Sequence, residues 1–132
     1  MTLESPPSRS LVLFVDDDPV SVRLVQEMLD RRGFEVEGCS DLEGARDRLR
    51  RVPAPDLLLL DLELPGGNGI DLCRAVRGEP GFAQLPIMIC SAHAKEQFIA
   101  VGFQAGANDY IEKPFTEAEL VARVENLARI AR

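Results

Sequence analysis

Residues 57–69 read LLLLDLELPGGNG, and this stretch decides the fold class. Four consecutive leucines without alternation indicate a strand that is covered by other elements on both faces. Asp61 follows the leucines directly, and a loop rich in glycine comes next. A strand buried on both faces is typical of a parallel sheet between two layers of helices, so Asp61 is expected at the carboxyl end of a central strand.

Other short apolar segments lie before and after this one, and segments with helical periodicity separate them. The expected strands are residues 11–15, 34–39, 56–60, 86–90 and 109–112, and the expected helices cover about 19–32, 41–51, 69–77, 95–105 and 116–130. Strands that alternate with helices of this length predict right-handed crossovers. We therefore predict an α/β fold, a doubly wound five-stranded parallel sheet with helices on both faces.

Several polar residues indicate where these helices begin and end. Asp18 before Pro19 has the pattern of an N-cap with proline at the first helical position, and Gly33 is placed to end that helix. Asp41 is a candidate cap for the next helix. Thr116, with glutamate three residues later, matches a capping box for the last one. Asp18 is therefore interpreted as a cap rather than a metal ligand.

The length and composition are those of one globular domain. The chain has 132 residues, of which 45% are hydrophobic and 28% charged. We expect residues 1–9, which are rich in proline and serine, to form a mobile leader before a single domain at 10–131. The arginines at positions 46, 48, 50 and 51 are interpreted as one solvated helix face.

Charge and cysteine content narrow the possible partners and the cellular location. A net charge of −7 argues against direct nucleic-acid binding, which needs a basic surface. Cys39, Cys73 and Cys90 have no metal-ligand spacing and are expected to be reduced thiols. No signal peptide is visible and no apolar run is long enough to span a membrane. A cytoplasmic protein without a membrane partner is the expectation.

Reactive side chains stand where the expected strands end. Asp16 and Asp17 follow the first strand, Asp61 the third, Ser91 the fourth, and Lys113 the fifth. Ligands of an open parallel sheet bind beyond the carboxyl ends of its strands, so these groups should converge. Clustered carboxylates need a cation, and so few oxygen ligands favour Mg²⁺ over Ca²⁺. With a lysine and a hydroxyl left to hold an anion, the pattern indicates phosphoryl transfer.

In these motifs the chain resembles the receiver domains of two-component response regulators. The resemblance covers about residues 10–131 and rests on VDDDP at 15–19, LLLLDLELPGGNG at 57–69, ICSAH at 89–93 and KPF at 113–115. It implies the flavodoxin-like strand order 2-1-3-4-5. It also implies a signalling switch that catalyses its own phosphorylation and dephosphorylation. The phosphoryl donor would be a phosphohistidine on a sensor histidine kinase or phosphotransfer protein. One departure is Asn68, which stands where many relatives carry aspartate and is a candidate cap for the third helix.

The resemblance also implies roles for individual residues. Asp61 corresponds to the phosphoryl acceptor. Mg²⁺ would be held by Asp16, Asp17 and Asp61 together with the backbone carbonyl of Glu63. Lys113 and Ser91 would contact phosphoryl oxygens, and the Lys113–Pro114 bond is expected to be cis. A further expectation follows from loop position, namely that the side chains of Glu63 and His93 flank the phosphoryl group and set its lifetime.

The output surface implied by the resemblance is the fourth helix, the fifth strand and the fifth helix. Phosphorylation would draw the Ser91 hydroxyl toward the new anion and leave space into which Tyr110 can rotate. On helix 95–105 the spacing predicts an inward face, and some apolar residues remain outside. The predicted inward residues are Ala100, Phe103 and Ala107, and the outward ones are Phe98, Ile99 and Val101. Asp109 and Arg123 match part of a charge-paired dimer pattern, but the helix lacks its basic residues. A hydrophobic contact with an output protein, or a differently built homodimer, is therefore expected.

Two other functions fit parts of the sequence. The first motif of haloacid-dehalogenase-like phosphatases matches Asp16-Asp17-Asp18-Pro19-Val20. A phosphatase of this type would leave Asp61 without a role. A non-phosphorylated interaction module of the same fold would not need the complete set of acidic residues, serine and lysine. Replacing Asp61 with asparagine distinguishes the phosphatase from a receiver. The substitution should abolish phosphorylation of a receiver, which loses its acceptor, and should spare the phosphatase.

Overall fold

The computed structural model describes residues 9–64, 67–92 and 96–130, so most of the expected leader lies outside it. Five parallel strands form the main sheet within these residues, in the spatial order β2-β1-β3-β6-β7. The strands are β1 (Ser10–Val15), β2 (Phe34–Cys39), β3 (Leu57–Leu60), β6 (Ile87–Ser91) and β7 (Asp109–Glu112). This arrangement confirms the predicted order 2-1-3-4-5.

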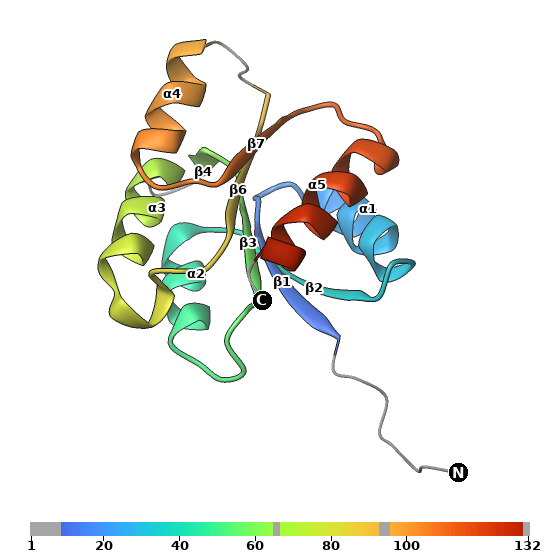
Figure 1. Ribbon diagram of the computed structural model, residues 1–132, viewed down its shortest axis with the longest axis horizontal. Coiled ribbons are helices and arrows are strands. Elements are labelled where there is room, and N and C mark those ends of the chain that lie inside the picture. The colour runs from blue at the N-terminus through green and yellow to red at the C-terminus, as the bar shows by residue number, and fades with distance from the viewer. Residues whose placement is uncertain (1–8, 65–66, 93–95, 131–132) are drawn as a thin grey trace.

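Helices cover both faces of the sheet, as predicted. They are α1 (Pro19–Asp30), α2 (Leu42–Leu49), α3 (Gly69–Gly78), α4 (Glu96–Gln104) and α5 (Glu117–Ile130), with a 3₁₀ turn at Pro80–Phe82. Figure 1 shows α1 and α5 on one side of the sheet and α2, α3 and α4 on the other. Within the described part of the chain, none of the helices is both long enough and apolar enough to cross a membrane.

The four leucines of β3 explain the two-layered core. Leu58 and Leu60 pack into one buried cluster with α2 and α3, and Leu57 and Leu59 pack into a second cluster with α1 and α5. All four are essentially inaccessible to solvent. Because both faces are covered, every residue of the strand is apolar. The edge strand β2 alternates more, with Phe34 buried and Glu35 exposed.

The predicted helix caps are present. The side chains of Asp18 and Asp41 accept hydrogen bonds from Val20 N and Gly44 N at 3.0 and 2.7 Å. For α3 the cap is Asn68, whose Oδ1 accepts from Ile70 N at 2.8 Å, and for α5 it is Thr116, whose Oγ1 accepts from Glu119 N at 3.1 Å. Gly33 follows α1 with φ +87°, a conformation that favours glycine. The strand and helix positions were thus predicted to within a few residues.

Two short features were not predicted. Glu63–Leu64 (β4) and Gly67–Asn68 (β5) pair as an antiparallel ribbon in the segment expected to be a plain loop. Both α1 and α2 end about two residues earlier than expected. After α2, prolines at positions 53 and 55 prevent continuation of the helix, because a residue before proline is disfavoured in helical conformation.

The inward face predicted for α4 was wrong, although Phe98 and Val101 lie partly outside as predicted. Ala100 is exposed and Phe103 is 46% exposed, whereas Gly102 is buried and Ile99 packs against the core cluster. A Cβ atom at Gly102 would lie 2.5 Å from Ile89 Cδ1, so glycine is what allows α4 to approach β6. Ala107 is buried as predicted, but it lies beyond the end of α4.

The arginines of α2 do not form a single solvated face. Arg48 is buried, and its Nε donates to Glu37 Oε2 at 2.6 Å while Nη2 donates to the carbonyl of Pro53 at 2.9 Å. Arg46, Arg50 and Arg51 are exposed as expected. Arg48 therefore joins α2 to the edge strand β2, a role that helical periodicity alone cannot indicate because it depends on which strand lies underneath.

Candidate functional site

Three aspartates meet at the carboxyl end of the sheet. Asp16 directly follows β1 and is only 2% exposed, Asp17 is exposed beside it, and the Asp61 side chain after β3 is 13% exposed. Each offers a carboxylate oxygen, and these atoms all lie within 4.8 Å of one another. The convergence predicted from strand ends is therefore present. A cleft of about 630 Å³ opens beside Asp17 and Asp61 toward the β4–β5 ribbon.

Lys113 lies over the same carboxylates. It follows β7, and its Nζ is 2.5 Å from Asp16 Oδ2 and 3.4 Å from Asp61 Oδ2. The Lys113 backbone N–H donates to the carbonyl of Ser91 at 2.9 Å, which holds the end of β7 beside β6. The Lys113–Pro114 bond is cis, as expected. One ammonium thus balances part of the charge of two partly buried carboxylates.

The surroundings of Asp61 and Lys113 shift both pKa values upward. Burial raises the pKa of the Asp61 carboxyl, the nearby Lys113 charge and the bond from Glu63 N lower it in part, and the charge of Asp16 raises it again. Burial lowers the pKa of Lys113, but the hydrogen bond to Asp16 and the charges of Asp61 and Asp16 raise it overall. Lys113 is therefore a stable cation. A cation beside Asp61 favours its ionised form.

Backbone hydrogen bonds fix the acidic residues in place. Asp61 N donates to the carbonyl of Val15 at 2.9 Å, and Asp61 Oδ1 accepts from Glu63 N at 3.2 Å. Asp16 Oδ1 accepts from Asp18 N at 2.9 Å. Asp61 Oδ2 faces Lys113, so the two oxygens of the acceptor candidate have different neighbours. Such fixed geometry is what a site needs when positioning provides most of its rate enhancement.

Ser91 and Tyr110 are both buried beside this cluster. Ser91 is the last residue of β6 and is 1% exposed. Burial raises the pKa of the Tyr110 phenol, while a side-chain hydrogen bond with Ser91 lowers it in part. Tyr110 therefore already lies inward, in contact with the serine that was expected to control its position.

The remaining predicted site residues have different outcomes. Asp18 is a helix cap that accepts from Val20 N and Ser21 Oγ, as interpreted from the sequence, and those bonds lower its pKa. Glu63 is exposed on β4 at the rim of the cleft. His93 lies outside the described residues.

Gly69 was missed by the sequence reasoning. Its N–H donates to the carbonyl of Leu62 at 3.0 Å, directly beside Asp61. The sequence placed Gly69 at the start of the third helix but offered no signal that its backbone lies against that of Asp61.

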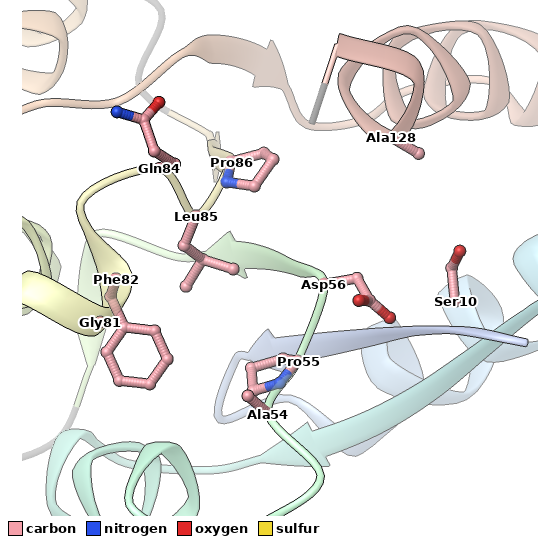
Figure 2. A pocket seen from close by; sticks show the side chains of 10 residues that line it. All are labelled: Ser10, Ala54, Pro55, Asp56, Gly81, Phe82, Gln84, Leu85, Pro86 and Ala128. Atoms are coloured by element: carbon pink, nitrogen blue, oxygen red, sulfur yellow. The ribbon is translucent and has the colours of Figure 1, made fainter. Parts of the chain in front are cut away.

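A second pocket lies at the opposite, amino-terminal edge of the sheet. Figure 2 shows Asp56 between Pro55 and Ser10, with Phe82 and Leu85 on the neighbouring loop. Its volume is about 260 Å³. Asp56 is its acidic side chain, and Asp56 Oδ2 accepts from Leu11 N at 2.7 Å, which joins β3 to β1. Among the described residues, the converging carboxylates and the lysine lie at the carboxyl edge and not in this pocket.

Several known proteins are similar to this chain in fold and in sequence. Residues 12–125 match the response regulator receiver domain family. The chain belongs to this family. The receiver is 41% identical over 124 residues to the DNA-binding response regulator MtrA of Mycolicibacterium smegmatis, covering 94% of this chain and 52% of MtrA.

Solved structures agree with this assignment. A putative response regulator from Chloroflexus aurantiacus superposes on the receiver with a TM-score of 0.87 at 37% identity, covering 92% of this chain and 98% of that one. The BeF3-activated N-terminal receiver domain of Klebsiella pneumoniae RstA gives a TM-score of 0.84 at 32% identity, covering 91% and 99%. The chain spans about half the length of the curated relatives that it matches. The activities of those complete proteins therefore involve regions beyond the part that matches this chain.

Proposed function

We propose that this receiver accepts a phosphoryl group on Asp61 from a phosphohistidine of a sensor histidine kinase or phosphotransfer protein. A carboxylate oxygen of Asp61 attacks phosphorus, the phosphorus–nitrogen bond breaks, and the leaving imidazole takes up a proton. The supporting observation is the convergence of Asp16, Asp17, Asp61 and Lys113 on one point of the sheet edge. The acyl phosphate that forms hydrolyses again, which suits a switch.

The donor set fits Mg²⁺. Carboxylates whose oxygens lie within 4.8 Å of one another are hard ligands that a divalent cation can bridge. Asp16, Asp17 and Asp61 would hold the ion, with the Glu63 carbonyl added by family resemblance. When bound, Mg²⁺ would neutralise the charge of the incoming phosphoryl oxygens. Lys113 holds a further oxygen through its ammonium, and Ser91 donates a hydrogen bond to another.

Two rim positions are proposed to set the lifetime of the acyl phosphate. Glu63 is exposed beside the cleft, where its side chain can reach the path of the attacking water. His93 is proposed as the second position on the basis of its place two residues after Ser91. Substituting alanine at both positions and timing dephosphorylation tests this, since an unchanged rate constant would mean that both side chains only face solvent.

The switch is proposed to work through Ser91 and Tyr110. Phosphorylation draws the Ser91 hydroxyl toward the new anion, which changes its hydrogen bond with Tyr110 and the packing around that ring. Since Tyr110 is already buried here, the proposal is a stabilisation of this inward position rather than a movement into it. The proposed output surface consists of α4, β7 and α5, which follow one another in the chain.

The character of that surface favours a hydrophobic contact. Phe98 and Val101 are each 38% exposed on α4. Arg123 Nη1 donates to Asp109 Oδ1 at 2.8 Å within the same chain, so these charges are already paired with each other. We propose an apolar contact with an output protein, or a homodimer that does not depend on charge pairs, and no direct contact with nucleic acid.

Intact-mass measurement after incubation with acetyl phosphate and Mg²⁺ tests the phosphoryl acceptor. One adduct is expected on the parent protein, none on Asp61→Asn, and strongly reduced amounts on Asp17→Ala and Lys113→Ala. Asp18→Asn is a matched control, because Asp18 caps α1 and lies outside the three-aspartate cluster. A full adduct on Asp61→Asn would contradict the assignment, and no adduct on the parent protein would favour a non-phosphorylated interaction module.

A further inference from the structure

We propose that Gly69 is a positioning residue for the phosphoryl acceptor. The absence of a side chain at this position lets the first residue of α3 lie against the backbone of Asp61, and this contact fixes the Asp61 carboxylate at the metal site. The proposal rests on the proposed function and assigns a role to a residue outside the set of groups that contact metal or phosphoryl oxygens.

The close approach is unusually tight. A Cβ atom at Gly69 would lie 2.4 Å from the carbonyl oxygen of Asp61, 3.1 Å from Leu62 Cα and 3.3 Å from the carbonyl carbon of Asp61. All three are backbone atoms, which cannot rotate away as the end of a side chain can. By contrast, a Cβ at Gly78, the last residue of the same helix, would have no atom within 4 Å apart from its chain neighbours and the nearby backbone of its own helix.

The described residues on either side of positions 65–66 are joined to one another next to Asp61. Gly69 N donates to the Leu62 carbonyl at 3.0 Å, and Glu63 pairs with Asn68 in the β4–β5 ribbon. Asp61 N is held by the Val15 carbonyl at 2.9 Å. The chain therefore leaves the sheet at Asp61 and returns to the same point at Gly69, so a displacement at one end is passed directly to the other.

A methyl group at position 69 would have to move one side of this contact by about 1 Å to reach ordinary van der Waals separation. The start of α3 is held by the buried side chains of Ile70 and Leu72. The Asp61–Leu62 peptide therefore takes up part of this displacement, and it carries both the acceptor carboxylate and the connection to the Glu63 carbonyl. Misplacement of reacting groups by about 1 Å can reduce a rate by about 100-fold.

The test compares Gly69→Ala with Gly78→Ala in the full chain. Mn²⁺ affinity, measured by electron paramagnetic resonance, reports on the carboxylate geometry without any reaction. The rate of phosphorylation by acetyl phosphate at saturating Mg²⁺ reports on the acceptor. For Gly69→Ala we expect at least about fivefold weaker Mn²⁺ binding and about 10- to 100-fold slower phosphorylation. Gly78→Ala should stay within about twofold of the parent in both measurements, since its added methyl meets no atom apart from its chain neighbours and its own helix backbone.

A second variant separates positioning from stability. Asn68→Ala removes the cap of α3, an Oδ1 bond of 2.8 Å to Ile70 N, without adding an atom near Asp61. It should lower the urea midpoint and leave Mn²⁺ affinity within about twofold of the parent, because the contact of Gly69 with Asp61 remains. Equal loss of affinity in Asn68→Ala and Gly69→Ala would mean that Gly69 acts only through stability and would overturn the proposal, as would parent-like behaviour of Gly69→Ala.

If Gly69→Ala does not fold, the parent protein still provides a test. In a Mg²⁺ titration followed by ¹H–¹⁵N NMR, the Gly69 amide should shift together with the Glu63 amide while the Gly78 amide stays unchanged. A Gly69 amide that does not respond would overturn the proposal. Failure of the proposed function is distinct, because the parent protein would then take up no phosphoryl adduct whatever the behaviour of the variants.

Discussion

Arg77 Nη2 donates a hydrogen bond of 2.8 Å to Asn108 Oδ1, and that same oxygen accepts from Ile87 N at 2.9 Å. The Arg77 guanidinium also donates to the carbonyls of Gly106 and Phe82, at 2.9 and 3.0 Å. One side chain at the end of α3 thus joins the start of β6, the 3₁₀ turn and the turn between α4 and β7. All of these lie at the edge of the sheet opposite the aspartates.

Replacing Arg77 with alanine should cost stability without affecting chemistry. Three hydrogen bonds from a charged donor are lost, and we expect the free energy of unfolding to fall by about 2–4 kcal/mol. Urea denaturation measures this. Arg74→Ala is the matched control, because Arg74 makes only an exposed 3.8 Å pair with Asp71 and should change stability by less than about 0.5 kcal/mol. Equal losses in both variants would show that Arg77 is not the connecting residue.

The Glu37–Arg48 pair predicts an acid-sensitive part of the stability. The hydrogen bond from Arg48 lowers the pKa of Glu37, so its contribution is complete above the pKa of the unfolded carboxyl. It is lost as pH falls through the lower, folded pKa. The unfolding free energy of the parent should exceed that of Glu37→Gln by about 1 kcal/mol at pH 7, since solvent screens this partly exposed carboxylate, and the difference should vanish in acid.

The control for this pH effect is Glu35→Gln, two residues earlier on the same strand, where the side chain is exposed. Its unfolding free energy should follow that of the parent across the pH range. A difference between the parent and Glu37→Gln that stays constant down to pH 3 would contradict the interpretation of Glu37 as an ionised partner of Arg48.

The three cysteines should differ in reactivity. Burial raises the pKa of the Cys90 thiol to about 12 and also raises the pKa of Cys73, which is fully inside the core. Cys39 is only half-buried. Titration with a thiol reagent at pH 8 should therefore label Cys39 first and the other two only after addition of denaturant. Rapid labelling of two or three thiols in the native protein would mean that the core opens more readily than this packing implies.

The apolar face of α4 gives a prediction about association. Phe98→Ser combined with Val101→Ser should leave phosphorylation of Asp61 intact and weaken association, measured by light scattering or by pull-down with a purified partner. Val52→Ser, at a residue that is almost fully exposed and distant from α4 in the chain, is the control. Association as strong in the double variant as in the parent would place the output surface elsewhere.

The strands, the helices and the convergence of side chains at one edge of the sheet could be predicted because they depend on local patterns, whereas the strand order came from the family resemblance. Unbroken apolar runs such as 57–60 identify central strands, and parallel strands bring their carboxyl ends together. Asp16, Asp61 and Lys113 therefore converge without any knowledge of side-chain packing. The helix caps are equally local, since each involves an oxygen and an N–H two or three residues apart.

What could not be predicted depends on which surfaces meet in three dimensions. Residues 98–101 of α4 are apolar all around, so periodicity does not identify an inward face, and the choice is made by Gly102 against Ile89. Arg48 looks like its exposed neighbours until β2 places Glu37 beside it. Gly69 differs from the other glycines of its loop only because the chain returns to Asp61 there.

The side chains of β6 point alternately into the two buried cores of the domain. Ile87 and Ile89 belong to the core under α2 and α3, and Met88 and Cys90 belong to the core under α1 and α5. Tyr110 belongs to the first of these cores and its neighbour Ile111 to the second.

Substitutions in different cores should therefore combine nearly additively where the two sites lie more than about 10 Å apart. The core beneath α1 and α5 could therefore be redesigned while the side-chain packing around Tyr110, on the other face of the sheet, stays the same.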